Sequence, residues 1–570
     1  MSSTLSPAAR LLPLLLFFWI LSGCAASEQV AAPADPPPAD TTPSETTAAP
    51  EPDETDDAAP LFDGAPDDWY LLDPEEAAFP GVSADRAYAT LLQGKAPKKT
   101  VVVAVIDSGI DIEHDDLDDN LWTNEDEVPG NGLDDDANGY VDDVHGWNFI
   151  GGPGGEQVEF DTFEVTRELA RLEPVYGEAD PATLSGAARA EYDYYLEVKQ
   201  AYEEVRAQYQ QNLANITGAV QAVGQAHAML AQHFGTEDYT MDQVAALDTS
   251  DQMLGRAREI MLYLAQVGVD REELARQQKS IENRLNYGLN LDFDPRPLVG
   301  DDYGDASERV YGNNDVAGPD PFHGTHVAGI IAAERGNGLG LDGIAPSARI
   351  MVLRAVPDGD ERDKDVANAI RYAVDNGADI INMSFGKDFS PQKAAVDAAV
   401  RHAEANGVLL VHGAGNDGED IDVSRNYPTR YYADEAEVAT WIEVGASSWE
   451  GPEMLAAPFS NYGKQNVDLF APGVSIYSTV PDQGFDRADG TSMAAPVVSG
   501  VAALVMAYYP ELTAVQVRDV LMRSAVPYAG QMVVRPGTEG EPVDFAALSR
   551  TGGLVNAYAA LQLAAEVAGQ

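Results

Sequence analysis

The sequence predicts an α/β protein with a mainly parallel central sheet, interrupted by a long helical insertion. Three observations support this prediction. Short runs of β-branched and aliphatic residues recur along the chain, helical patterns lie between several of them, and one long segment has a purely helical period. Strands that alternate with helices form parallel sheets whose two faces are covered by helices. We expect the α/β body at residues 99–155 and 300–565, and the insertion at residues 156–299.

Composition and charge exclude several classes of protein. The 570 residues are too many for one ordinary domain, and 35 Lys and Arg against 94 Asp and Glu give a net charge of −59. Such a chain repels phosphate backbones and anionic lipid headgroups, so no nucleic-acid partner is expected. The acidity fits either a surface adapted to high salt or a very soluble exported protein. A single cysteine excludes an intrachain disulfide.

Residues 1–24 are typical of an export signal. Arg10 precedes the apolar run Leu11–Leu21, which is too short for a permanent membrane span. The run ends in Leu-Ser-Gly-Cys, which resembles the bacterial lipoprotein processing box, with Cys24 as the acylated residue. A cleaved signal peptide with an incidental cysteine is the alternative. Because Ala25 follows, the resemblance implies a lipid anchor in the cell envelope, at the outer membrane, and clipping of the tether would release a soluble protein.

Two further segments precede the predicted body. Residues 25–60 consist largely of Ala, Pro, Asp, Glu and Thr, and they bury too little apolar surface to offset the entropy of ordering. We therefore expect a disordered acidic, proline-rich tether. Residues 61–98 form an N-terminal extension that contains the apolar stretch Trp69–Leu72.

The strands of the body are expected at five apolar runs. The first, Lys99–Ile106, is continuously β-branched and predicts a strand that is buried on both faces. Helical patterns cover Lys364–Asn376 and Pro391–Asn406. The other four strands are expected at Arg349–Leu353, Ile380–Met383, Val408–Val411 and Trp441–Val444.

The insertion is expected to form a helical hairpin or small bundle. Between Tyr195 and Leu230, apolar or aromatic side chains recur every three or four residues, with His227 filling one step. This spacing predicts the buried seam of one long helix. Two further helices are expected over Asp251–Ala265 and Arg271–Asn286. A cofactor site built from the tyrosines and His227 is the alternative, but residues at this spacing usually pack.

Three separate motifs carry the residues of a nucleophilic hydrolase. Asp107 ends the first strand, and parallel sheets place their sites at the carboxyl ends of strands. His323 and Ser492 each open a helix, and at Ser492 the backbone N–H groups and the helix dipole are suited to a developing oxyanion. A histidine takes the proton of a serine when a carboxylate fixes its tautomer, so these residues form a candidate triad. Asn416, after the strand at Val408–Val411, is a second donor to the same oxyanion.

These motifs resemble those of the subtilase (subtilisin-like, S8-type) family of serine endopeptidases. DSGID at 107–111, HGTHVAG at 323–329, GAGN at 413–416 and GTSMAAP at 490–496 occur in the order of the family. The resemblance implies a subtilisin-like three-layer fold and an EC 3.4.21-type peptidase that acts on polypeptides without an organic cofactor. It makes Ser492 the nucleophile, His323 the general base and then acid, Asp107 the residue that orients it, and Asn416 part of the oxyanion hole. The resemblance also implies a substrate-binding role for Ser384, Phe385 and Gly386 on one side and for Ala414 and Gly415 on the other.

Calcium is expected in an acidic loop that begins near residue 130. Oxygen ligands occupy positions one, three, five, seven and nine of a calcium-loop pattern with glycine at six, but His145 replaces the closing glutamate at twelve. A solvated acidic loop is the alternative. The expected ligands are Asp134, Asp136, Asn138, Tyr140 and Asp142. Resemblance to subtilases implies a second calcium site at Asp116 and Asn337.

Several alternatives stay open at this stage. The stretch before Lys99 is too short for the usual inhibitory prodomain of subtilases, so the insertion is a candidate chaperone, lid or substrate adaptor. A catalytically idle, surface-tethered scaffold that binds peptides is the main alternative to an endopeptidase, and a structural envelope lipoprotein is the third. We expect His326 to have a structural role, and the sequence fixes neither the substrate preference nor the oligomeric state.

Overall fold

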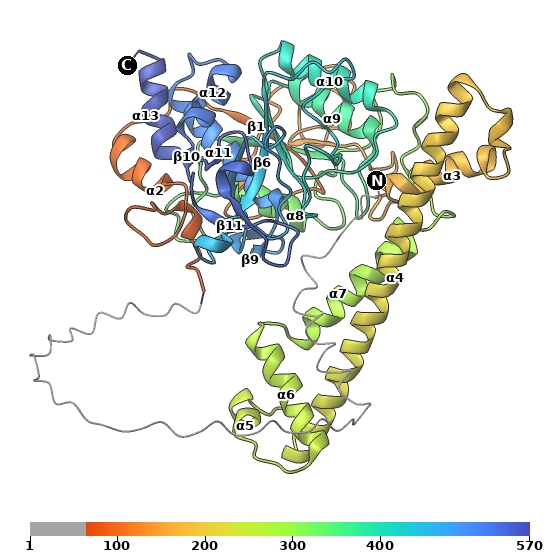
Figure 1. Cartoon of the computed structure of the whole chain (residues 1–570). Helices are drawn as coiled ribbons and strands as arrows, with labels where there is room; N and C mark the ends of the chain where they lie inside the picture. Colours follow the sequence, from red (N-terminus) through yellow and green to blue (C-terminus); the bar gives the residue numbers. More distant parts are fainter. Residues whose placement is uncertain (1–63, 570) are drawn as a thin grey trace, which may run out of the picture.

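The computed structural model describes residues 64–569, which form a sheet-containing body and a long helical arm (Figure 1). The predicted signal, the tether and Cys24 lie outside the described residues. The helices are α2 Ala84–Arg86, α3 Glu164–Tyr176, α4 Gly186–Phe234, α5 Met241–Ala245, α6 Gln252–Gln266, α7 Arg271–Asn283, α8 Phe322–Ala332, α9 Asp363–Asp375, α10 Lys393–Ala405, α11 Thr491–Tyr508, α12 Ala514–Ser524 and α13 Ala557–Val567.

A nine-stranded sheet with the order β10-β13-β7-β6-β5-β4-β1-β3-β2 forms the centre of the body. Its neighbouring strands are parallel apart from the pair β10 and β13. The strands of this sheet are β1 Val102–Asp107, β2 Gly146–Asn148, β3 Arg349–Arg354, β4 Ile380–Met383, β5 Leu409–Gly413, β6 Trp441–Ser447, β7 Leu469–Pro472, β10 Val526–Pro527 and β13 Gly553–Leu554. Two separate two-stranded sheets are formed by β8 Ile476–Val480 with β9 Gly484–Ala488 and by β11 Met532–Val534 with β12 Pro542–Asp544. The predicted fold class, an α/β protein with a mainly parallel sheet, is confirmed. The first strand begins at Val102 and not at Lys99.

The two faces of the sheet are buried under different helices, which gives three layers. In β1, Val103 and Val105 pack into one cluster with α8, α11 and α13, while Ala104 and Ile106 pack into another with α9 and α10. Successive side chains of a strand point to opposite faces, so a continuous apolar run is what a doubly covered strand requires.

Helix α11 runs through the first of these clusters. It is long and apolar enough to cross a membrane, but 89% of its most apolar window is buried inside the body. Its hydropathy is therefore explained by its place against strands β4 to β7. Ser492, the second residue of α11, is only partly buried.

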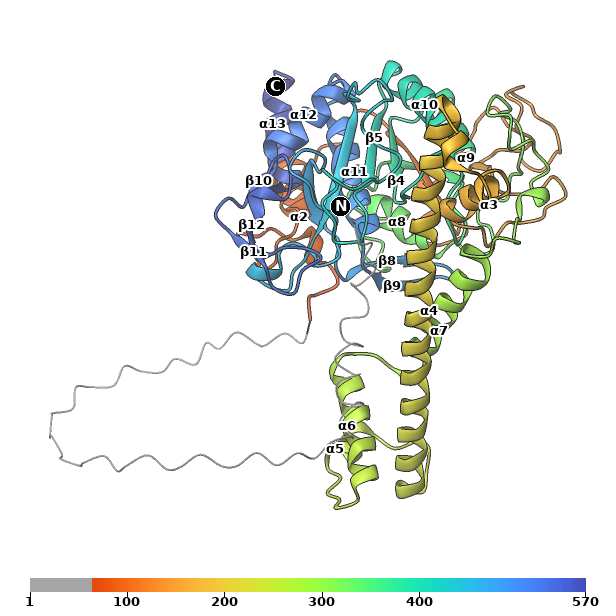
Figure 2. The same cartoon turned by 45° about the vertical axis from the view of Figure 1, so that its right-hand side comes forward.

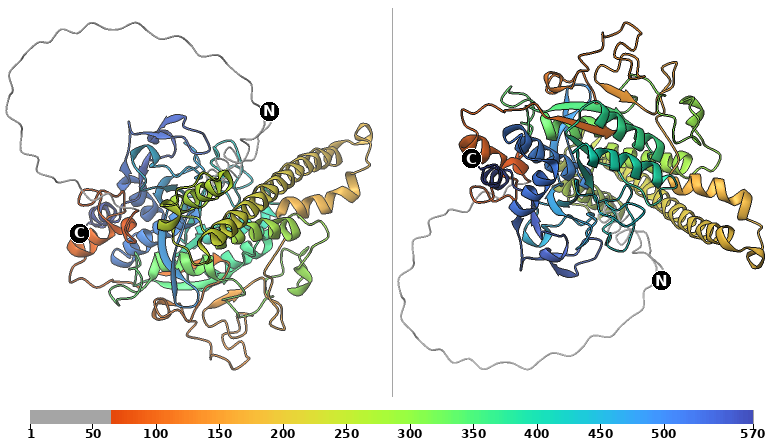
Figure 3. Two further views of the ribbon diagram at one scale, coloured as in Figure 1. Left: turned by 90° about the horizontal axis from the view of Figure 1, so that it is seen from below. Right: turned by 90° about the horizontal axis from the view of Figure 1, so that it is seen from above.

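The insertion forms the arm. Helix α4 has 49 residues, a length of about 75 Å at 1.5 Å per residue. Near the body it packs against α3, and farther out against α5, α6 and α7 (Figures 2 and 3). In the outer part, His227 Nδ1 lies 2.7 Å from the hydroxyl of Tyr239. On either side of the insertion, Asn148 and Asn313 form an antiparallel bridge with N···O distances of 2.9 and 3.0 Å.

The N-terminal extension is an integral part of the body. Trp69, Tyr70 and Leu71 are at most 1% exposed and belong to the cluster around α11. The extension also contacts the last helix, since the Ala557 N–H donates to the Val82 carbonyl at 2.7 Å. The sequence analysis assigned this segment no such role.

Candidate active site

Asp107 and His323 meet at the carboxyl edge of the sheet. Asp107 is the last residue of β1, and His323 is the second residue of α8. The distance from His323 Nδ1 to Asp107 Oδ1 is 2.7 Å. The carboxylate side chain is 3% exposed and the imidazole 38% exposed. With Nδ1 donating to the shielded carboxylate, Nε2 keeps the lone pair of a base.

Close backbone packing makes this contact possible. A Cβ atom on Gly324 would lie 2.1 Å from the carbonyl oxygen of Gly109 and 3.2 Å from Asp107 Cβ. Gly109 itself has φ +119°, and a Cβ there would lie 2.0 Å from the carbonyl oxygen of Ala317. Glycines at these positions let the start of α8 press against the end of β1.

Ser492, in helix α11, lies beside the end of strand β4, which neighbours β1. Its hydroxyl donates to the Ser384 carbonyl at 3.0 Å, and the Ser384 hydroxyl donates back to the Ser492 carbonyl at 2.9 Å. Ser384 directly follows β4, which pairs with β1 in the register Ile106 to Met383. Asp107 directly follows Ile106 and Ser384 directly follows Met383, and adjacent strands lie about 4.8 Å apart. The three residues of the candidate triad therefore gather at two adjacent strand ends.

A series of hydrogen bonds between buried polar side chains links Ser499 to Ser384, the residue that contacts Ser492. Ser499, two turns along α11, donates to Asn382 Oδ1 at 2.8 Å, and Asn382 Nδ2 donates to the Ser384 hydroxyl at 2.9 Å. Asn382, Ser384 and Ser499 are at most 5% exposed. The sequence analysis did not single out Asn382 or Ser499, because a polar residue within a strand or a helix gives no local signal of such a link.

Asn416 is oriented by the residue before Ser492. Its Oδ1 accepts from the Thr491 N–H at 2.9 Å and from the Thr491 hydroxyl at 3.1 Å, which directs Nδ2 elsewhere. A Cβ on Gly490 would lie 3.5 Å from Ser492 N and 3.7 Å from Asn416 Nδ2. Two N–H donors therefore border the open space beside Gly490, as an oxyanion hole requires.

The predicted substrate-binding segments follow the adjacent strands β4 and β5, paired through Met383 and His412. Ser384 is buried, Phe385 half-buried and Gly386 exposed. On the other segment, Ala414 is buried and Gly415 half-buried with φ +99°.

Asn426 lies between these segments and was not predicted. Its Oδ1 would be 2.2 Å from a Cβ on Gly386, and its Nδ2 donates to the Gly413 carbonyl at 3.2 Å. Asn426 belongs to a loop that has no motif of its own, so only the folded chain reveals its position.

The other histidines of the body have structural partners. His326 is buried, its Nε2 lies 2.9 Å from the Ile476 carbonyl oxygen, and burial lowers its pKa to about 4. His412 Nδ1 lies 2.8 Å from Glu443 Oε1 inside the sheet. Both therefore hold strands in place, and neither lies in the candidate triad.

The acidic loop brings together part of the predicted calcium ligands. Carboxylate oxygens of Asp134, Asp136 and Glu127 lie within 4.8 Å of one another, and Glu127 was not predicted. Asn138 Nδ2 donates to Asp136 Oδ2 at 3.0 Å, and the Tyr140 hydroxyl donates to the carbonyl of Arg309. The Asp142 carboxylate does not join the group, because it accepts the N–H groups of Asn131 and Gly132 at 3.1 and 2.8 Å.

The second predicted calcium site is more compact. Asn337 Nδ2 donates to Asp116 Oδ1 at 2.6 Å. The other oxygen, Asp116 Oδ2, is buried without a hydrogen-bond partner among the described residues. An unsatisfied buried carboxylate oxygen fits a hard cation.

The arrangement as a whole defines a class of protein. An Asp–His pair, a serine at a helix N-terminus and two N–H donors at one sheet edge have the arrangement that serine hydrolases use. A model of the subtilase family (Peptidase S8) matches residues 98–550, so the chain belongs to the subtilase family. The family resemblance found in the motifs is confirmed. The resemblance to lipoproteins concerns residues outside the described range and stays a prediction.

Curated relatives agree with this assignment. Subtilisin BL of Lederbergia lenta is 39% identical over 204 residues, which are 36% of this chain and 70% of that protein. The major intracellular serine protease of Bacillus subtilis (strain 168) is 42% identical over 195 residues, 33% of this chain and 56% of that protein. Subtilisin NAT of Bacillus subtilis subsp. natto is 38% identical over 205 residues, and the match spans only 50% of its length.

Proposed function

We propose that this protein is a serine endopeptidase that cleaves polypeptides through an acyl-enzyme on Ser492. The observation that carries the proposal is the 2.7 Å contact between the shielded Asp107 carboxylate and His323, beside the strand end that holds Ser492. A scaffold that only binds peptides has no need for an imidazole held in this way. The names of the relatives, subtilisins and serine proteases, support the same conclusion.

In the proposed mechanism, the Ser492 hydroxyl turns from the Ser384 carbonyl toward His323. Nε2 takes its proton as Oγ attacks the peptide carbonyl, and Asp107 stabilises the imidazolium. The new oxyanion accepts hydrogen bonds from the Ser492 N–H and from Asn416 Nδ2. The imidazolium then gives its proton to the leaving amine. Water repeats the cycle on the ester, which releases the acid product and restores Ser492.

A fluorophosphonate probe tests the nucleophile directly. We expect it to label the protein at one serine, identified as Ser492 by peptide mass spectrometry, because only a serine with a base beside it attacks phosphorus. Ser492→Ala should abolish labelling, whereas Ser524→Ala, a change at the end of α12, should not. No labelling of the folded protein would favour the idle scaffold, and labelling that persists in Ser492→Ala would rule out Ser492 as the reactive nucleophile.

Asn416 provides a second test, through transition-state stabilisation. Asn416→Asp keeps the acceptor for Thr491 but loses the donor, so we expect kcat to fall by about 10²–10³-fold. Asn416→Leu loses both the acceptor and the donor, so its kcat should fall at least as far. KM should change little, because the donor acts mainly on the oxyanion. Steady-state kinetics on one peptide measures this, and an Asp variant with wild-type kcat would remove Asn416 from the oxyanion hole.

We also propose that Ca²⁺ binds at one or both acidic sites and stabilises the fold. The support is the Glu127, Asp134 and Asp136 group and the unsatisfied Asp116 oxygen. A bound ion would neutralise these carboxylates and stabilise the folded state by mass action. It has no role in the proposed chemistry.

The location of the enzyme is proposed from residues 1–24 alone. The signal pattern and Cys24 support a lipid anchor at the outer membrane. Residues 25–60 would then hold the catalytic body away from the lipid surface.

A further inference from the structure

The root of the arm is joined to the chain that continues the substrate-binding segment Ser384–Gly386. Lys387 is 6% exposed, and its Nζ lies 2.7 Å from Glu164 Oε2 at the start of α3 and 2.9 Å from Asp363 Oδ1. Phe389 packs into the cluster formed by α3 and the near part of α4. The insertion therefore forms part of the wall next to the proposed cleft.

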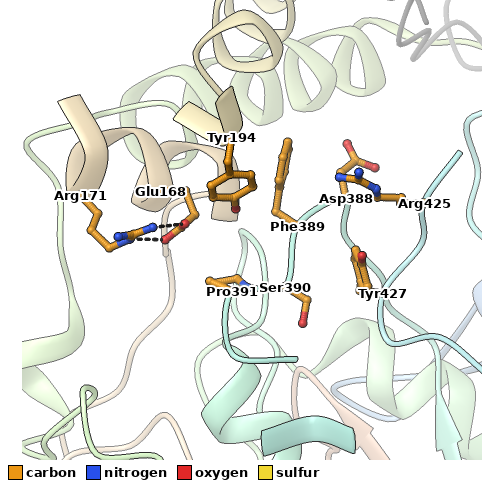
Figure 4. A pocket seen from close by; sticks show the side chains of 9 residues that line it. All are labelled: Glu168, Arg171, Tyr194, Asp388, Phe389, Ser390, Pro391, Arg425 and Tyr427. Atoms are coloured by element: carbon orange, nitrogen blue, oxygen red, sulfur yellow. Dashed lines mark hydrogen bonds and ion pairs between the residues drawn. The ribbon is translucent and has the colours of Figure 1, made fainter. Parts of the chain in front are cut away.

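A cavity of about 300 Å³ lies at this junction (Figure 4). One side consists of Glu168, Arg171 and Tyr194 from the insertion, and the other is formed by the body, including Asp388, Phe389, Arg425 and Tyr427. The rings of Tyr194 and Phe389 have centroids 6.2 Å apart and stand at 63° to each other. Three aromatic side chains thus line a space that the body alone would leave open.

The charges around the cavity are paired except for one. Glu168 accepts two hydrogen bonds from Arg171, both 2.9 Å, and Arg425 lies 2.8 Å from Glu197. The Asp388 carboxylate has no hydrogen bond or ion pair among residues 64–569. The cavity therefore presents one free carboxylate beside aromatic rings.

Asp388 is exposed to solvent, and the groups around it disfavour its charged form unless a cation lies nearby. The protein around it, together with Asp417, Asp360 and Glu419, raises the pKa of Asp388 to about 7. Arg425 acts in the opposite direction and lowers the pKa of Asp388. A carboxylate in such a field gains from a cation, and aromatic rings attract the same charge through their faces.

We propose that this cavity is a substrate subsite for a basic side chain, lysine or arginine, of the peptide before the scissile bond. The inference rests on the proposed function. A peptide is the favoured occupant because the cavity continues the segment whose first residue, Ser384, contacts Ser492. Asp388 is four positions after Ser384, a span of at most about 14 Å. The basic residue therefore lies within about five positions of the scissile bond.

Paired peptides test the subsite. Quenched fluorescent peptides carry either lysine or norleucine at one of the five positions before the scissile bond. At one position, kcat/KM should be about tenfold higher for lysine. Asp388→Asn and Tyr194→Leu should remove most of this preference, so that kcat/KM for the lysine peptide falls to about the value for the norleucine peptide in the same variant. Asp519→Asn, an exposed change on α12 that alters net charge equally, should keep it.

Binding to the Ser492→Ala protein separates the two proposals. Fluorescence anisotropy should show the lysine peptide binding about tenfold more tightly, with the difference lost in the double variant with Asp388→Asn. Suppose that the Ser492→Ala protein shows this preference, while the protein with Ser492 is neither labelled by the fluorophosphonate nor active on peptides. That result would uphold the subsite and overturn the endopeptidase proposal. Equal binding of both peptides at every position, or a lysine preference that survives Asp388→Asn and Tyr194→Leu, would overturn the subsite.

Discussion

Replacing His323 by alanine is expected to lower kcat by about 10⁶-fold, close to the effect of removing Ser492 itself. Ser492 has no other base of suitable pKa in the proposed mechanism, and its hydroxyl would stay on the Ser384 carbonyl. The milder Asp107→Asn keeps the shape of the pair but favours the wrong tautomer of His323, and we expect a loss of about 10⁴-fold. Both are measured as kcat on a fluorogenic peptide at saturating concentration.

Two controls make the His323 result specific. The midpoint of thermal unfolding should stay near the wild-type value, since the imidazole is partly exposed. His402→Ala removes another partly exposed histidine that lies 2.7 Å from a carboxylate, Asp375, and should leave kcat unchanged. A His323→Ala protein with more than a tenth of wild-type kcat would rule out the proposed mechanism.

Replacing Lys387 by methionine is expected to destabilise the protein by about 3–5 kcal/mol. The change keeps the apolar stem but leaves Glu164 and Asp363, both at most 2% exposed, without the ammonium group between them. Lys199→Met is the matched control, because Lys199 pairs with Glu173 at 3.3 Å on an exposed helix surface and should contribute at most about 1 kcal/mol. Denaturant unfolding of both variants measures the difference.

The same ion pair predicts a dependence on pH. Arg167 and Lys387, acting against the effect of burial, lower the pKa of Glu164 to about 2. A lowered pKa in the folded state stabilises the protein above the unfolded value of about 4.3 and loses that effect as pH falls toward 2. The stability gap between wild type and Lys387→Met should therefore be full near neutral pH and shrink below pH 4. A gap no larger than that of Lys199→Met at pH 7 would contradict the prediction.

The parts of the fold that follow from local pattern were predictable. The strand at Ile380–Met383 and the helix α9 match their predicted ranges to within one residue, because continuous apolar runs and helical spacing are properties of the nearby sequence. The hairpin β8–β9 and the docking of Trp69 were not predicted. The hairpin is local, but its second strand, Gly484–Ala488, is polar and largely unburied and so lacks an apolar run. The docking of Trp69 depends on contacts with distant segments, for which a single sequence gives no local signal.

The residues of the candidate site were likewise predictable only where a local motif marks them. Asp107 and His323 are 216 residues apart, and only their motifs suggested that they meet. Glu164 and Lys387 are 223 residues apart and belong to no motif, so their contact appears only in the folded chain. In the acidic loop, spacing identified Asp134 and Asp136, but it assigned Asp142 to the group and missed Glu127, because backbone turns decide where each carboxylate points.

The bridge between Asn148 and Asn313 bears on whether the arm is a detachable module. Because Asn148 and Asn313 are hydrogen-bonded on either side of the insertion, a short connection would reconnect the body after excision, provided that core residues between them such as Phe149 and Tyr311 are kept. The chain topology therefore permits a shortened protein without the arm, but the loss of the ion pair between Glu164 and Lys387 opposes it. Excision would remove Glu164 and leave Lys387 with Asp363 as its remaining carboxylate partner, so an engineered form without the arm has to keep Lys387, because an apolar residue there would leave the Asp363 carboxylate without its ammonium partner.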